Sequence, residues 1–208
     1  SDVYKRQPMR NIWKRTAAAV LALVLCLSLM APALAEAPVR GGSLTIAKTN
    51  KLTSFNPATT SSRNEDGYIY YMVFDTLISF DEAGNLAPKL ATSWETSEDG
   101  LIFTLKLRDD VTFHDGTPFN AEAVKANLDW AIAEDTGHVY KTSELGNIVS
   151  IDVVDEFTVN VNLAKPDAAL PSVFTNICGL MLSPASLASG DIVTNACGTC
   201  LLYTSPSP

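Results

Sequence analysis

The chain has 208 residues and a formal net charge of −8, from 15 lysines and arginines against 23 aspartates and glutamates. The excess is larger between residues 36 and 199, where 10 basic residues face 22 acidic ones, a net charge of −12. Nucleic acids and anionic membrane surfaces need a positively charged footprint, so this balance argues against both as partners. It suits an exported protein that has to stay in solution.

A secretory signal peptide is predicted at residues 9–35. It has a positively charged start, an uncharged apolar stretch over 17–30, and the small residues Ala33 and Ala35 at the expected cleavage site. A transmembrane anchor needs about 20 apolar residues, and this stretch is shorter. We therefore expect cleavage after Ala35, with Glu36 as the first mature residue.

The next predicted elements are a strand over residues 43–48 and, after a polar stretch, an amphipathic helix. The apolar stripe of this helix is expected to consist of Ile69, Met72, Val73 and Leu77, with Tyr68, Tyr70 and Tyr71 around it. A short strand over residues 77–80 and a turn over 81–85 are expected to follow.

A β-hairpin is predicted over residues 91–107. Strand patterns occupy 91–97 and 101–107, and Glu98-Asp99-Gly100 between them is a strong short hairpin signal. The two strands are therefore expected to pair antiparallel.

A turn and a capped helix are predicted after this hairpin. Aspartate, glycine and proline cluster over residues 109–118, and Asn120 stands where a helix N-cap is expected. Beyond it, Val124, Leu128 and Ile132 recur every four residues, which predicts an amphipathic helix.

A second hairpin is predicted over residues 148–154 and 157–163, around an Asp155-Glu156 turn. A short helix over residues 167–176 then carries Pro171 near its start, where proline is tolerated. Hairpins beside amphipathic helices indicate a layered α/β domain with α+β character.

Several segments together resemble a known family. They are GGSLTIA, SFNPATTSS, VFDTLISFDEAGNLAPKLATSWE, FHDGTPFNAEAVKANLDW, and SPASL followed by NACGT. In this order and at about this spacing they resemble the extracellular solute-binding proteins of family 5, the oligopeptide, dipeptide, glutathione and nickel receptors of ABC importers. The resemblance covers residues 40–199. It implies a type II periplasmic-binding-protein fold, in which two lobes close on a ligand held between them.

The resemblance also implies a domain plan. Residues 38–74 would begin the first lobe, 75–188 would form a small subdomain inserted into it, and 189–199 would return to it. Residues 1–8 and 200–208 look foreign to such a protein. The first segment precedes a plausible initiator Met9, and CLLYTSPSP at the other end stands where the family continues with Gly-Pro-aromatic. The expectation is an N-terminal fragment that lacks the other lobe.

Cys26 leaves a second processing route open, because many receptors of this family are anchored through a lipid on a cysteine. The preceding Leu23-Val24-Leu25 puts a bulky leucine where lipid attachment wants a small residue. We therefore favour an ordinary apolar residue inside the signal peptide.

A ligand-binding segment is predicted after the first strand, where the family places the rim of its cleft. Its hydroxyls, amide and ring are typical of the few polar groups that ligand sites place on a mostly apolar wall. The same residues also suit an ordinary polar loop of turn formers. The candidate residues are Thr53, Ser54, Phe55, Asn56, Thr59, Thr60, Ser61 and Ser62.

No catalytic, metal or cofactor site is predicted. His114 and His138 are too far apart to form a metal pair on one helix, and His114-Asp115-Gly116 is favoured as a turn over acid–base work. The acidic residues around 109–115 lack the spacing of a calcium loop. The chain also lacks the G-x-S-x-G, phosphate-loop and zincin patterns.

Two pairs of residues leave alternatives open. Trp94 and Trp130 are favoured as core residues over a stacking surface for a ligand. Cys178 and Cys197 either form a disulfide, which export would permit, or are two buried apolar residues.

The leading hypothesis is a receptor that captures a short peptide or a related small solute and delivers it to an ABC permease. The alternative is a secreted hydrolase whose catalytic part lies beyond residue 199. The sequence does not choose between dipeptide, oligopeptide, glutathione and metal chelate as the ligand.

Overall fold

A computed structural model describes residues 45, 47, 54–59, 67–193 and 196–199. The predicted signal peptide and most of the strand predicted at residues 43–48 lie outside this part of the chain. The described elements, in chain order, are η1 (Pro57–Thr59), α2 (Gly67–Val73), β1 (Ile78–Phe80), β2 (Leu86–Pro88), β3 (Ala91–Thr96), β4 (Ile102–Leu107), α3 (Ala121–Ile132), η2 (Lys141–Leu145), β5 (Ile148–Asp155), β6 (Thr158–Leu163), α4 (Leu170–Val173), η3 (Ile177–Gly179) and α5 (Pro184–Ser189).

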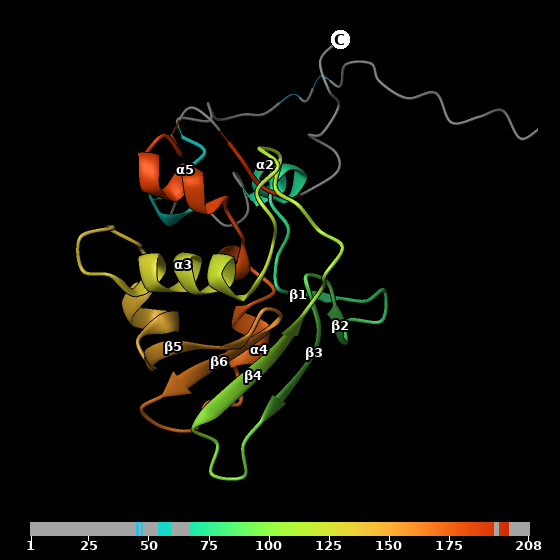
Figure 1. Cartoon of the computed structure of the whole chain (residues 1–208), viewed down its shortest axis with the longest axis vertical. Coiled ribbons are helices and arrows are strands. Elements are labelled where there is room, and N and C mark those ends of the chain that lie inside the picture. Colours follow the sequence, from blue (N-terminus) through green and yellow to red (C-terminus); the bar gives the residue numbers. More distant parts are fainter. Residues whose placement is uncertain (1–44, 46, 48–53, 60–66, 194–195, 200–208) are drawn as a thin grey trace, which may run out of the picture. The chain divides into compact units, whose positions relative to one another are not determined.

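The two predicted hairpins join into one antiparallel sheet with the strand order β3-β4-β6-β5 (Figure 1). The first hairpin turns at Gly100, whose φ of +74° is readily adopted only by glycine. The Asp99 carboxylate fixes this turn by accepting hydrogen bonds from Ser97 Oγ at 2.6 Å and from the Leu101 N–H at 3.1 Å. Both hairpin predictions are therefore confirmed, with strand ends that differ by at most one residue.

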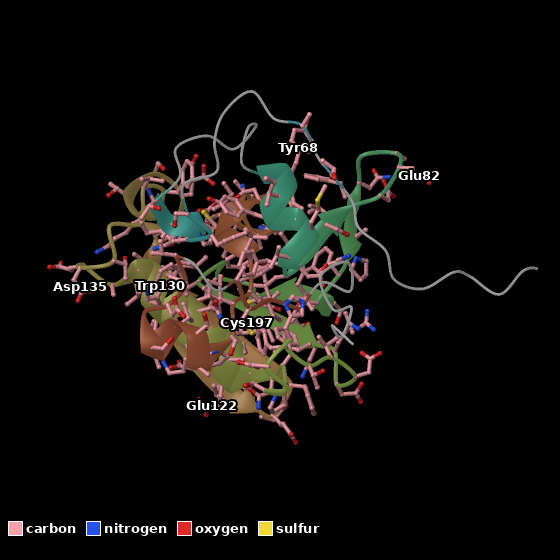
Figure 2. The ribbon with its side chains drawn as sticks, turned by 90° about the horizontal axis from the view of Figure 1, so that it is seen from above. Tyr68, Glu82, Glu122, Trp130, Asp135 and Cys197 are labelled. Carbon is pink, nitrogen blue, oxygen red and sulfur yellow. The ribbon has the colours of Figure 1, made fainter. Side chains whose placement is uncertain are left out.

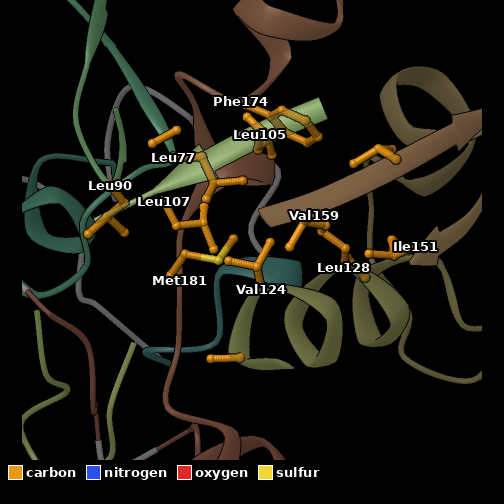
Figure 3. Packing of buried hydrophobic residues seen from close by; sticks show 14 of the residues in the cluster. Leu77, Leu90, Leu105, Leu107, Val124, Leu128, Ile151, Val159, Phe174 and Met181 are labelled. Carbon is orange, nitrogen blue, oxygen red and sulfur yellow. The ribbon is translucent and has the colours of Figure 1, made fainter. Parts of the chain in front are cut away.

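Helix α3 covers one face of the sheet (Figure 1). It begins as predicted, because Asn120 Oδ1 accepts a hydrogen bond from the Ala123 N–H at 3.0 Å. Val124 and Leu128 are fully buried and pack near Val159 of β6 (Figure 3). Ile132 is only partly buried, because the helix ends at this residue.

A smaller hairpin of β1 and β2 stands apart from the four-stranded sheet. The predicted turn between these strands is held by Asp81, whose Oδ1 accepts from the N–H groups of Ala83 and Asn85 at 2.9 and 2.8 Å. The short helix around Pro171 is confirmed as α4, with the proline in its first turn.

The apolar stripe predicted for the helix before β1 is right for Val73 but wrong for Ile69, Met72 and Leu77. Helix α2 ends at Val73, so Leu77 lies beyond it and the four-residue spacing does not continue. The buried residues of this helix are Gly67, Tyr70 and Val73, whereas Ile69 and Met72 are only half-buried. The ring of Tyr70 therefore points into the core, where the hydrophobic pattern had placed Ile69 and Met72.

The buried apolar side chains form two clusters. The larger cluster lies between the sheet and α3 and includes Phe103, Leu105 and Val161. The smaller cluster, called here the α2 cluster, joins the end of α2 to chain more than 100 residues later. It consists of Tyr70, Val73, Phe74, Ile177, Leu180, Leu182, Ile192 and Ala196.

The amide of Asn127 ties α3 to the segment that enters the α2 cluster. It is only 3% exposed. Its Nδ2 donates to the carbonyl oxygens of Ala123 and Leu182 at 2.9 and 2.8 Å, and its Oδ1 accepts from the Leu182 N–H at 2.9 Å. A buried amide with these partners is satisfied rather than costly.

Candidate ligand-binding site

Half of the predicted ligand-binding segment lies in the described part of the chain. Ser54, Phe55, Asn56 and Thr59 are described, with the first three partly buried and Thr59 exposed. The other four candidate residues, Thr53, Thr60, Ser61 and Ser62, lie outside the described residues.

The polar side chains of residues 54–59 bond within their own turn. Ser54 Oγ accepts from the Asn56 N–H at 2.9 Å, and Asn56 Oδ1 accepts from the Ala58 N–H at 2.9 Å. Thr59 Oγ1 donates to the carbonyl oxygen of Asn56 at 3.2 Å. These contacts are what turn formers make, and they do not use the Asn56 amide nitrogen.

Three distant elements hold this segment in place. The Phe55 N–H donates to the Val193 carbonyl oxygen at 3.0 Å, and the Val139 N–H donates to that of Ala58 at 2.9 Å. The Tyr70 hydroxyl of α2 donates to the Ser54 carbonyl oxygen at 3.2 Å. The Phe55 ring packs against the α2 cluster. A segment fixed in this way has the rigidity that a binding site needs.

The turn at His114, Asp115 and Gly116 is structural, as predicted. Gly116 has a φ of +83°, and Asp115 Oδ1 accepts from the Thr117 N–H at 2.9 Å. The turn also binds the chain near residue 198. The His114 N–H donates to the Gly198 carbonyl oxygen at 2.9 Å, and the Gly198 N–H donates to His114 Nδ1 at 3.2 Å.

A hollow of about 400 Å³ opens beside this turn, next to α5. Asp115 and Cys197 both line it. Cys197 is buried and lies near the middle of the view in Figure 2. Partial burial opposes ionisation of Asp115, but hydrogen bonds from Ser183 Oγ and the Thr117 N–H outweigh it and lower the pKa of this carboxyl. Burial raises the pKa of the Cys197 thiol, and the negative charge of Asp115 acts in the same direction.

These groups are not arranged as an activated nucleophile and its base. His114 Nδ1 accepts from a main-chain N–H, so this nitrogen is engaged in holding the turn. The lowered pKa makes Asp115 a weak base, and the raised pKa keeps Cys197 as a thiol. Nucleophilic catalysis needs the opposite shifts.

His138 is a core residue. It is 7% exposed, and its ring makes edge contacts with Trp130 and Tyr140 at centroid distances of 6.1 and 6.3 Å. Burial lowers its pKa, so the neutral imidazole is favoured. Among the described residues, no group of three or more histidines, cysteines, aspartates or glutamates could hold a metal ion.

The structure bears on the alternatives left open for the two cysteines and the two tryptophans. Cys178 and Cys197 are both buried thiols and do not form a disulfide. Trp94 and Trp130 are partly buried and pack against the larger cluster, which confirms them as parts of the core.

A family model described as bacterial extracellular solute-binding proteins, family 5 middle, matches residues 85–199. The match spans more than half of the chain. The chain belongs to this family, as the sequence motifs predicted.

Curated relatives with detectable similarity include the glutathione-binding protein GsiB of Escherichia coli. GsiB of strain K12 is 37% identical over 114 residues, which make up 55% of this chain and 22% of GsiB. The chain thus spans only about a fifth of the length of this relative.

Solved structures show the same fold. NikZ of Campylobacter jejuni, in complex with Ni(L-His), is 30% identical with a TM-score of 0.64 over 73% of this chain and 30% of NikZ. DppA of Helicobacter pylori, in complex with the peptide STSA, is 25% identical with a TM-score of 0.61 over 71% of this chain and 33% of DppA. The mixed helix-and-sheet fold is therefore part of a type II periplasmic binding protein.

Within the described ranges, no helix is long and apolar enough to cross a bilayer.

Proposed function

We propose that this chain is part of the substrate-binding component of an ABC importer, which captures a short peptide or a related small solute outside the cytoplasmic membrane. The family match over residues 85–199 carries this proposal. GsiB, NikZ and DppA are named as binders of glutathione, a nickel–histidine complex and a peptide. Their common feature is a small polar solute, and the partner of the loaded receptor would be an ABC permease.

The chemistry of the described residues favours a receptor over the alternative of a secreted hydrolase. The cluster of a histidine, a carboxylate, a serine and a thiol beside α5 has pKa shifts that oppose nucleophilic activation. A solute-binding protein needs a rigid rim at its cleft instead, and hydrogen bonds from or to Tyr70, Val139 and Val193 fix residues 54–59. The proposed ligand-contacting residues remain those predicted at 53–62.

The proposed domain plan places a small subdomain between two passages of the first lobe. Support comes from the α2 cluster, which joins residues 70–74 to residues 177–196. A chain that leaves the first lobe and later returns to it would form a separate core where its two passages meet, and the α2 cluster is such a core. In this plan the return begins near Ile177, earlier than the boundary at 188 that the sequence suggested. Export through a cleaved signal peptide at residues 9–35 belongs to the same proposal.

The proposal is tested by ligand-dependent thermal stabilisation of the complete protein that contains this chain. The panel comprises dipeptides, tripeptides, glutathione and nickel–histidine. A ligand that binds only the folded state stabilises it by RT ln(1 + [L]/Kd), about 2.7 kcal/mol at a hundredfold excess over Kd. Stabilisation by one class of solute supports the receptor, whereas hydrolysis of a panel member, or no response to any, contradicts it.

Variants of the rim test the position of the site. We expect Thr59→Ala and Asn56→Ala to weaken binding of the solute found by the panel. Thr92→Ala is the matched control, because Thr92 also donates a side-chain hydrogen bond to a main-chain carbonyl but lies on β3. Equal affinity in all three variants would remove residues 54–59 from the site.

A further inference from the structure

A second hollow lies between the end of α2, the β1–β2 hairpin and the loop after α4. Its volume is about 360 Å³. This is at the lower end of the roughly 300 to 1,000 Å³ typical of small-molecule sites, and it suits a molecule the size of one amino acid. None of the residues that line it belongs to the proposed rim at 53–62.

An ion pair lies in this hollow. Lys89 Nζ is 3.1 Å from Asp75 Oδ1, and the side chains are 48% and 15% exposed. The other oxygen of Asp75 accepts from Thr199 Oγ1 at 3.2 Å. An ammonium group has three hydrogens, so one contact with Asp75 leaves Lys89 able to donate to a further acceptor. The hollow therefore presents a positive and a negative group side by side.

Two hydroxyl groups in the wall are oriented as acceptors. Ser79 Oγ donates its hydrogen to the Ala87 carbonyl oxygen at 3.2 Å, and Thr175 Oγ1 donates to that of Ser172 at 2.7 Å. A hydroxyl has one hydrogen but two lone pairs. What these residues offer to a guest is therefore oxygen lone pairs, which match the hydrogens of an ammonium group.

Two aromatic rings complete the wall. Tyr71 of α2 and Phe80 at the end of β1 line the hollow and are 42% and 55% exposed. Exposed rings beside a polar floor give a guest an apolar surface to pack on. They also attract a cation that lies over their faces.

We infer that this hollow binds a free α-amino acid with an aromatic or large apolar side chain. The carboxylate of the amino acid is bound by Lys89. Its ammonium group is bound by Asp75 and by the hydroxyl oxygens of Ser79 and Thr175, and its side chain packs against the rings of Tyr71 and Phe80. This is an accessory site, which goes beyond the proposed capture of a solute by the rim segment.

The test uses the complete protein and measures dissociation constants by saturation-transfer NMR, with L-phenylalanine as the probe. 3-Phenylpropanoate is L-phenylalanine without the ammonium group, and 2-phenylethylamine is L-phenylalanine without the carboxylate. We expect each analogue to bind about tenfold more weakly than L-phenylalanine, because each loses one charge-assisted contact. Equal binding of all three would contradict the recognition of a zwitterion.

Single substitutions test whether L-phenylalanine binds in this hollow. Lys89→Met and Phe80→Ala are expected to weaken L-phenylalanine binding about tenfold, and the exposed Phe80 is a position where truncation leaves the core intact. The matched controls are Lys165→Met and Val154→Ala, which remove an exposed cation and an exposed apolar side chain elsewhere. Unchanged binding in Lys89→Met and Phe80→Ala, or no binding to the unaltered protein at about 10 mM, overturns the inference.

The outcomes separate this inference from the proposed function. If the solute found by the panel abolishes L-phenylalanine binding, the probe occupies the cleft and the accessory site is wrong. If Phe80→Ala loses L-phenylalanine but keeps that solute, the accessory site stands as a separate one. If the panel finds no solute while L-phenylalanine still binds in the hollow, only the proposed function fails.

Discussion

His114 and Gly198 exchange two hydrogen bonds across 84 positions of the chain. The His114 N–H donates to the Gly198 carbonyl oxygen at 2.9 Å, and the Gly198 N–H donates to His114 Nδ1 at 3.2 Å. The second of these bonds requires a side-chain acceptor at the position of Nδ1. The histidine in this turn is therefore a link between two segments of the fold.

We expect His114→Ala to lower the free energy of unfolding by about 1 kcal/mol, because the Gly198 N–H loses its partner. His114→Asn is the matched variant, since its Oδ1 can accept at nearly the same place as Nδ1. Urea denaturation of the complete protein measures both. A larger loss in the asparagine variant than in the alanine variant would contradict the role of Nδ1.

Gly198→Ala is expected to be more damaging than a change of the histidine. A Cβ at Gly198 would lie 2.2 Å from the Val73 carbonyl oxygen and 2.6 Å from the Phe74 ring. Main chain would have to move, at a cost of roughly 3 kcal/mol. Gly84→Ala is the control, because Gly84 has a φ of +83° but an added Cβ there meets nothing within 4 Å. It should cost about 1 to 2 kcal/mol, from backbone strain alone, and a greater loss at Gly84 would refute the steric argument.

The buried His138 is expected to make stability depend on pH. Burial lowers its pKa in the folded protein below the usual value of about 6.5, so the unfolded chain binds more protons in this range. The contribution of His138 is then complete above about pH 6.5 and is lost as the pH falls towards the folded-state pKa. His138→Phe keeps an aromatic ring beside Trp130 and Tyr140. It should reduce the loss of folding stability that occurs as the pH falls below about 6.5.

The measurement is the free energy of unfolding of both proteins between about pH 7.5 and 5. Trp130 adds a local readout, because its ring lies 6.1 Å from that of His138 and its fluorescence responds to the charge on the imidazole. Identical slopes for the two proteins would show that His138 is not the group that titrates.

The sequence predicts those parts of this fold whose signals are local. The Asp99-Gly100 turn, the Asn120 cap and the strand alternation of 101–107 each act over a few residues, and the structure confirms all three. The stripe of α2 was mispredicted, because burial there depends on chain at residues 177–196 that packs against Tyr70. Amphipathic patterns do not reveal which distant segment covers a helix.

Two polar interactions between distant residues are not predicted by the sequence. Asn127 lies on the buried side of α3, one residue before Leu128, and a polar residue on an apolar face is the signal that was available. The Asp75–Lys89 pair had no such signal, because the two residues lie on either side of the β1–β2 hairpin and not on one helix or strand. For the rim segment, composition suggested hydroxyl groups for a ligand, while the fold uses two of them, those of Ser54 and Thr59, within the turn.

The Cys197 thiol is predicted to react slowly although it lines an open hollow. Its side chain is 8% exposed, burial raises its pKa, and Asp115 adds a negative charge nearby. Alkylation proceeds through the thiolate, so the rate at Cys197 should be at least about tenfold lower in the folded protein than in urea. Peptide mapping by mass spectrometry after timed exposure to iodoacetamide resolves this cysteine from any other.

Asp115→Asn separates the contribution of charge from that of burial at Cys197. Without the negative charge the thiolate forms more readily, so the alkylation rate of the folded variant should exceed that of the unaltered protein. Asp110→Asn is the control, because Asp110 is an exposed carboxylate that pairs with Arg108 instead. Equal acceleration in both variants would mean that looser folding, rather than the charge beside the thiol, controls the reaction.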